Sequence, residues 1–219
     1  ISIVSVLVAS ASLVAVNSVW LTKRSLSLHL RMAIGFVTVI SWLAYNLYYL
    51  HPENFNWSVS LPLYLCDLTG AIAGYSLISN NRRCRALLYF WGLCLTTQSF
   101  IFPIGDQNPY HIHYWIFWVM HGLIFACALF DLFEGRFRPQ MADLVTATKC
   151  SLLYGLVIFS INTIFGWNYG FLGISSHTTP EIITMFGPWP YRVPILLGVS
   201  ILQQSLLLLP WRAFSQTNI

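Results

Sequence analysis

The chain has 219 residues, of which 57% are hydrophobic, 16% aromatic and only 8% charged, with a formal net charge of +4. This composition and a mean hydropathy of +0.66 exclude an ordinary soluble domain and indicate an all-α polytopic membrane protein. The basic residues form no continuous stripe, so we expect no nucleic-acid partner.

A hydrocarbon core about 30 Å thick requires roughly 20 apolar residues in each helix that crosses it. The chain contains seven apolar runs of about that length, separated by short polar breaks. We therefore predict a single bundle of seven transmembrane helices within residues 1–214, followed by a polar tail over 215–219. The predicted spans are 1–22, 31–50, 59–80, 85–103, 112–133, 141–166 and 192–211.

The breaks between these spans differ in charge. The first, third and fifth breaks contain the basic residues Lys23, Arg24, Arg31, Arg82, Arg83, Arg85, Arg136 and Arg138. The alternate breaks contain Glu53, Asp106 and Glu181. Because Lys and Arg are enriched in short cytoplasmic loops, the pattern predicts an outside N-terminus and a cytoplasmic C-terminus in the cell membrane.

The third predicted span contains an ionisable pair, Cys66 and Asp67, inside an apolar run. Ionisable groups within a membrane are costly, and they commonly mark a functional site. Gly70 and Gly74 follow with G-x-x-x-G spacing, which lets a neighbouring helix approach closely. The sequence therefore predicts a site around Cys66 that is built from several helices.

The positions of other polar residues along their spans predict which of them share this site. A helix rises about 1.5 Å per residue, so His121 in the fifth span lies at the depth of Cys66, roughly 10 Å below the outer end. Asn46, Gln98 and Asn162 each lie four or five residues from the outer end of their own span. These polar groups could instead be simple hydrogen-bonding contacts between helices, and His121 could be a satisfied core histidine.

A cysteine and a histidine at one depth indicate acyl transfer through a thioester. We predict that Cys66 is the nucleophile and His121 the base, with sulfur and ring nitrogen within about 5 Å of each other. Asp67 or Asn162 would orient the imidazole, and Gln98, Asn162 or Asn46 would donate to the oxyanion. The predicted substrate is a phospholipid or lysophospholipid, and the chemistry requires no cofactor. Four aromatic residues are predicted to contact the substrate: Tyr64, Tyr114, Trp118 and Trp91.

Histidine also allows a different use. His111 and His113 stand at the outer end of the fifth span with Asp106 nearby, and such a set can bind zinc, although no fixed ligand spacing is met. The five cysteines are odd in number, which argues against a disulfide framework. Cys84 lies among arginines that would lower its pKa, but the positive-inside rule alone explains that cluster.

Several motifs in order resemble a known family. They are Leu61-Pro62-Leu63 with Cys66-Asp67, the run Arg85 to Gly92 with Thr97-Gln98, His113-Tyr114-Trp115 with His121-Gly122, Gly135 to Pro139, Asn162 with Asn168-Tyr169, and Gly187 to Pro190. Together they resemble the YwaF-like bacterial integral-membrane family. That family is similar to the eukaryotic transmembrane acyltransferase of polyunsaturated ether phospholipids, and more distantly to the androgen-dependent TFPI-regulating protein hydrolases.

The resemblance implies a membrane-embedded acyl-transfer site whose cysteine and histidine fall on Cys66 and His121. This chain has Tyr64 where the family pattern implies a histidine, so its substrate choice is expected to differ. The prediction is a phospholipid acyltransferase or an acyl hydrolase in the outer half of the bilayer. One alternative is a non-enzymatic lipid-binding or transport protein, and another is a metal-dependent lipid hydrolase. The sequence leaves the oligomeric state open.

Overall fold

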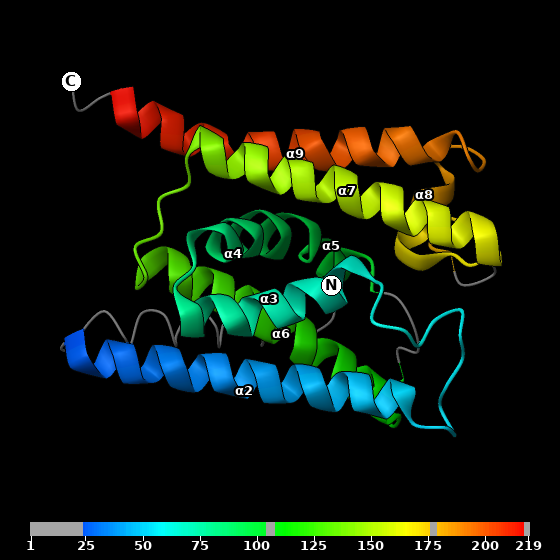
Figure 1. The fold of residues 1–219 in the computed structure, drawn as a ribbon, viewed down its shortest axis with the longest axis horizontal. Coiled ribbons are helices and arrows are strands. Elements are labelled where there is room, and N and C mark those ends of the chain that lie inside the picture. The colour runs from blue at the N-terminus through cyan, green and yellow to red at the C-terminus, as the bar shows by residue number, and fades with distance from the viewer. Residues whose placement is uncertain (1–23, 104–107, 176–178, 217–219) are drawn as a thin grey trace.

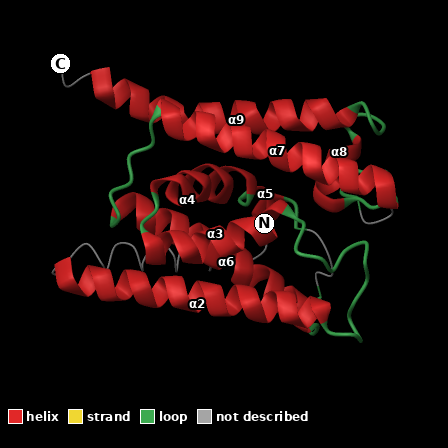
Figure 2. Cartoon of the chain, in the orientation of Figure 1, coloured by secondary structure: helices red, strands yellow, loops and turns green. Residues whose placement is uncertain are grey.

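The computed structural model describes residues 24–103, 108–175 and 179–216, and every regular element within these ranges is a helix (Figure 2). The predicted span over residues 1–22 lies outside the described residues. The elements in chain order are α2 (Arg24–Leu50), α3 (Leu65–Ser79), α4 (Arg82–Leu87), the π-helix η1 (Leu88–Leu95), α5 (Gln98–Ile101), α6 (Ile112–Phe133), α7 (Met141–Phe165), the 3₁₀ turn η2 (Tyr169–Phe171), α8 (Glu181–Thr184) and α9 (Arg192–Gln216).

Four of these helices are long and apolar enough to cross a membrane. Their apolar segments are Leu28–Leu50, Ile112–Phe133, Met141–Phe165 and Arg192–Arg212. Each agrees within a few residues with a predicted span. The prediction of an all-helical membrane protein is therefore confirmed at this level.

The third predicted span is shorter than expected, since its helix begins at Leu65 and the residues before it form turns. Tyr64 has an extended backbone, with φ −71° and ψ 149°, and its N–H donates to the Asp67 carboxylate over 3.1 Å. This side chain caps the helix and fixes its start. Cys66 is consequently the second residue of α3, in its first turn, whereas the predicted span began six residues before α3, at residue 59.

The fourth predicted span, 85–103, is not one regular helix. It is divided among α4, η1 and α5, and the wide π turn shows in the bond from the Thr96 N–H to the Trp91 carbonyl, 2.9 Å long. The Thr97 hydroxyl donates to the carbonyls of Leu93 and Cys94, and so competes for backbone acceptors where the helix changes form. Such π segments are frequent near functional sites.

Figure 1 shows how the helices are layered. α2 lies on one side, α7 and α9 lie together on the other, and α3, α4 and α6 lie between them. α2 and α3 approach closely where Gly35 faces Gly74, because a Cβ at Gly74 would be 2.9 Å from the Gly35 carbonyl oxygen. This packing is consistent with the prediction that the glycine spacing of α3 lets a neighbouring helix approach closely.

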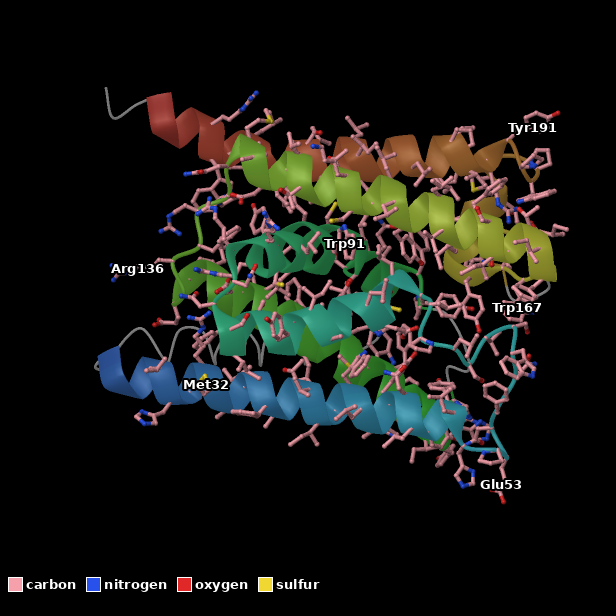
Figure 3. All side chains as sticks on the ribbon, viewed as in Figure 1. Met32, Glu53, Trp91, Arg136, Trp167 and Tyr191 are labelled. Atoms are coloured by element: carbon pink, nitrogen blue, oxygen red, sulfur yellow. The ribbon has the colours of Figure 1, made fainter. Side chains whose placement is uncertain are left out.

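The two ends of the bundle differ in chemistry. Figure 3 places Arg136 at one end and Glu53, Trp167 and Tyr191 at the other. We call the first the basic end. Two ion pairs hold the helices there: Arg82 with Asp143 at 2.7 Å and Arg85 with Asp131 at 2.8 Å.

Candidate functional site

Cys66 occupies the first turn of α3 with its thiol free. Its polar neighbour is Asp67, whose Oδ1 lies 4.0 Å from the sulfur. The other oxygen of Asp67 accepts the Tyr64 N–H, and the Asp67 carbonyl accepts the Trp42 indole N–H over 2.7 Å. Asp67 thus fixes the turn that carries the thiol.

Four tyrosine side chains lie in the neighbourhood of Cys66 and Asp67. Their phenols lie close enough to interact electrostatically with the Cys66 thiol, and they come from three parts of the chain: Tyr45 and Tyr49 of α2, Tyr64 before α3, and Tyr154 of α7. We call these four residues the tyrosine cage. The sequence analysis named only Tyr64 among them. The i, i+4 spacing of Tyr45 and Tyr49 on one helix face was the available signal for two others.

His121 is buried on α6, and its ring orientation is fixed by its own helix. Nδ1 lies 2.8 Å from the Phe117 carbonyl oxygen, and the Phe117 ring packs at 4.1 Å between centroids. A carbonyl can only accept, so Nδ1 carries the proton and Nε2 presents its lone pair. His121 is therefore built as a neutral base whose reactive nitrogen is Nε2.

Cys66 and His121 lie on helices that pack against each other, α3 and α6. The packing is close near both residues. Gly70 lies one turn after Cys66, and a Cβ placed on it would be 2.7 Å from the methyl group of Met120, the residue before His121. Within the described chain no hydrogen bond joins the thiol to the imidazole. Catalytic hydrogen bonds often form fully only in the substrate complex.

The other predicted polar residues bind elsewhere. Asn46 donates to the Trp42 carbonyl of its own helix over 2.8 Å. Gln98 donates to Gln203 of α9 over 2.7 Å. Asn162 uses both amide atoms on the Tyr169 backbone, at 2.8 and 2.9 Å. These hydrogen bonds are typical of structural contacts within a helix or between segments. Of the four predicted supporting residues, Asp67 is the one whose side chain contacts Cys66.

Of the four predicted aromatic contacts, Tyr64 belongs to the tyrosine cage and Trp91 packs against Tyr154 of the cage. The Tyr64 ring packs on Tyr169 at 5.1 Å between centroids. Trp91 packs 6.4 Å from Tyr154 and donates its indole N–H to the Ser151 hydroxyl over 2.9 Å. Both therefore already have protein partners that hold them in place.

The other two, Tyr114 and Trp118, lie on α6 before His121. Trp118 is one turn from His121, and its ring packs on those of Tyr114 and Phe100. Its indole nitrogen is fully buried, with no acceptor among the described residues. A buried N–H without a partner costs roughly 1–3 kcal/mol, so this group is suited to a ligand oxygen.

The segment that leads into α3 is held by the loop after α7. The Tyr169 hydroxyl donates to the Trp57 carbonyl over 2.7 Å and accepts the Leu61 N–H over 3.0 Å. Burial raises the pKa of Tyr169 to about 12, so the phenol keeps its proton at physiological pH. Arg192, fully buried at the start of α9, donates to the carbonyls of Phe171 and Gly173.

The histidines proposed as metal ligands have other contacts. His113 has Nε2 3.1 Å from the Tyr48 hydroxyl and Nδ1 3.4 Å from that of Tyr49. Asp106 lies outside the described residues. In the ranges that the structure describes, no three His, Cys, Asp or Glu side chains are grouped closely enough to hold a metal ion.

Cys84 differs from the sequence expectation. The sequence analysis considered a pKa lowered by the neighbouring arginines and set it against the positive-inside rule. Burial instead raises the pKa of Cys84, and the nearby Cys150 adds to the effect. Cys84 is therefore not an activated thiol.

No curated protein and no solved structure is similar enough to this chain to count as a match. A family model does match, and it covers residues 1–208, which is nearly the whole chain. This is a family of transmembrane proteins related to the acyltransferase named above. The links to the YwaF-like family and to the TFPI-regulating hydrolases stay predictions. The chain belongs to the TMEM164 family.

Proposed function

We propose that the chain is a phospholipid acyltransferase of the cell membrane that works through a thioester on Cys66. The observation that carries the proposal is a free thiol in the first turn of α3, next to a carboxylate and within a cage of phenols. A cysteine that only fills space in a core needs neither a neighbouring carboxylate nor nearby phenols. In this proposal the chain forms seven transmembrane helices, with an outside N-terminus and a cytoplasmic C-terminus.

The first half of the reaction forms the thioester. His121 Nε2 takes the thiol proton, and Cys66 Sγ attacks the ester carbonyl of a phospholipid. The C–S bond forms, the C–O bond breaks, and the departing lysolipid oxygen takes the proton back from His121. Because no hydrogen bond joins Cys66 to His121, the proposal requires the two groups to come together as the ester binds.

The second half transfers the acyl group. A lysophospholipid hydroxyl gives its proton to His121 and attacks the thioester, so that a new C–O bond forms and the C–S bond breaks. The Cys66 thiolate leaves and takes the proton from His121, which restores the free thiol and the neutral imidazole. The Tyr154 hydroxyl already donates to the Leu63 carbonyl. The proposed donor to the oxyanion is therefore the Tyr64 hydroxyl, in place of Asn46, Gln98 and Asn162. Cys66 is only partly exposed, and tyrosines lie near it. We therefore favour a lipid hydroxyl over water as the acceptor, since exclusion of water protects a thioester.

The proposal is tested with purified protein and a labelled diacyl phospholipid, with and without lysophospholipid. We expect labelled acyl chains to appear on the lysophospholipid, and activity to be lost in Cys66→Ala and Cys66→Ser. Cys84→Ala is the matched control, and it should keep full activity. Equal release of free fatty acid with and without acceptor would show that water is the acceptor and that the protein is a hydrolase.

The alternative function is lipid binding without catalysis, which the missing Cys66–His121 hydrogen bond favours. It predicts that the lipid binds and that no acyl product forms in either condition. Cys66→Ala would then bind the lipid as well as the wild type does. Inhibition by a chelator would instead favour a metal-dependent hydrolase.

A further inference from the structure

A pocket of about 230 Å³ opens at the basic end, and its lining does not include Cys66. It lies where α7 begins and α9 ends, at the end of the molecule that carries the C-terminus (Figure 1). Its lining comes from two segments: Pro139, Gln140 and Met141 before and at the start of α7, and Leu208, Trp211 and Arg212 on α9. We call it the α7–α9 pocket.

The walls of the α7–α9 pocket are mostly apolar, but the charge around it is positive. Arg212 lines it directly. The Arg138 guanidinium lies 5.0 Å above the Trp211 ring that forms one wall, and its hydrogen bonds go to the carbonyls of Leu132 and Phe137. Those partners carry no formal charge, so the positive charge of Arg138 persists at the pocket.

The nearby carboxylate does not cancel this charge. Asp143 accepts two hydrogen bonds from Arg82, at 3.1 and 2.7 Å, and also accepts the Gln140 N–H that begins α7. Its charge is matched by Arg82 and its oxygens are occupied. The pocket therefore combines an apolar cleft with two arginines, Arg212 in its lining and Arg138 above its Trp211 wall, and arginine is the residue best suited to phosphate.

The location indicates which phosphate compound fits. The apolar segment of α9 ends at Arg212 and that of α7 begins at Met141, so the pocket lies at the edge of the hydrocarbon layer. Val145 and Leu209, farther along the two helices, expose large parts of their side chains and continue the apolar surface toward the membrane interior. The volume is below the roughly 300–1,000 Å³ of pockets that enclose a whole ligand, so it suits one end of a lipid.

We propose that the α7–α9 pocket binds the headgroup of an anionic phospholipid, with its phosphate held by Arg138 and Arg212 and its acyl chains along α7 and α9. Basic pockets between transmembrane helices are a recognised form of anionic-lipid site. The bound lipid would link α7 to α9, and so stabilise the bundle by mass action. This site is separate from the Cys66 site and does not depend on acyl transfer.

The test uses the full chain in neutral detergent, and measures thermal unfolding and lipid retention by native mass spectrometry. The probes are phosphatidylglycerol and phosphatidylcholine with identical acyl chains. We expect phosphatidylglycerol to raise Tm well above the effect of phosphatidylcholine. Arg138→Gln with Arg212→Gln should weaken phosphatidylglycerol binding about tenfold or more, since two charge-assisted hydrogen bonds are removed.

The control is Arg83→Gln, which removes an exposed charge at the same end but away from the pocket. It should retain the phosphatidylglycerol effect. Met141→Trp, which fills the pocket mouth and keeps both arginines, should reduce the effect and serves if the double variant does not fold. Equal stabilisation by both lipids, equal loss in Arg83→Gln, or the same shift with inorganic phosphate alone would each overturn the proposal.

Discussion

At the residue scale the site depends on groups whose hydrogen bonds are incomplete. Trp118 is buried with no acceptor for its indole N–H among the described residues, whereas the N–H of Trp91 donates to Ser151. The two tryptophans therefore differ in what each can offer a lipid. We assign a substrate oxygen to Trp118 and a structural role to Trp91.

The change Trp118→Phe tests this assignment. It removes the orphan N–H and keeps an aromatic ring, so we expect little loss of thermal stability but a KM for phospholipid raised several-fold. Trp91→Phe is the matched control, and loss of its hydrogen bond to Ser151 should lower stability by about 1 kcal/mol. An unchanged KM in Trp118→Phe would contradict the assignment.

Tyr169 positions the thiol from a distance. Tyr169→Phe removes the hydroxyl that holds Trp57 and Leu61, and so loosens the segment that leads into α3. We expect kcat to fall by about tenfold, since a small displacement of a reacting group is costly, while the bundle stays folded. Because the phenol pKa is about 12, the role of Tyr169 should be independent of pH between 6 and 9. A wild-type kcat in Tyr169→Phe would show that the hydroxyl does not position α3.

At the element scale, the close approach of α2 to α3 brings Tyr45 and Tyr49 of the tyrosine cage near Cys66. A Cβ at Gly74 would lie 2.9 Å from the Gly35 carbonyl and 3.0 Å from the Val39 nitrogen, both backbone atoms that cannot rotate away. Gly74→Ala should therefore separate the helices and cost roughly 1–3 kcal/mol. Gly198→Ala is the control, because no heavy atom outside the immediate chain lies within 4 Å of its Cβ position. Equal melting temperatures for the two variants would argue against the close packing.

The four long helices could be predicted because each is a continuous apolar run with polar residues at both ends. The start of α3 could not be predicted in this way. Residues 59–63 are about as apolar as the helix that follows, and only the cap formed by Asp67 sets the start of the helix after Tyr64. The division of 85–103 into α4, η1 and α5 was missed for a similar reason. Hydropathy is the same for an α-helix and a π-helix, and only the hydrogen bonds distinguish them.

Cys66, Asp67 and His121 were predicted because ionisable residues are conspicuous in apolar runs. Tyr45 and Tyr154 were not, because tyrosine is common in membrane proteins and these residues are far apart in sequence. Depth along a span could not show the direction of the Asn46, Gln98 and Asn162 side chains. Their helix faces and loop contacts direct them to partners other than Cys66.

At the scale of the whole molecule, ion pairs hold the basic end together. Arg85 and Asp131 are both largely buried, with side chains 14% and 3% exposed, whereas the Arg82 side chain is 54% exposed. Asp131→Ala leaves a buried arginine without its carboxylate and should cost about 3–5 kcal/mol. Arg82→Ala should cost much less, because water can replace most of its contacts. Thermal unfolding of the two variants compares them directly, and a smaller effect for Asp131→Ala would contradict this ranking.

The central claim, a thioester on Cys66, is tested most directly by mass spectrometry of the protein after incubation with a diacyl phospholipid and no acceptor. The account predicts an added acyl mass on the peptide that contains Cys66, removable by hydroxylamine, reduced in His121→Ala and absent in Cys66→Ala. An acyl group on another residue, or acyl transfer with unmodified Cys66 and full activity in Cys66→Ala, would contradict it.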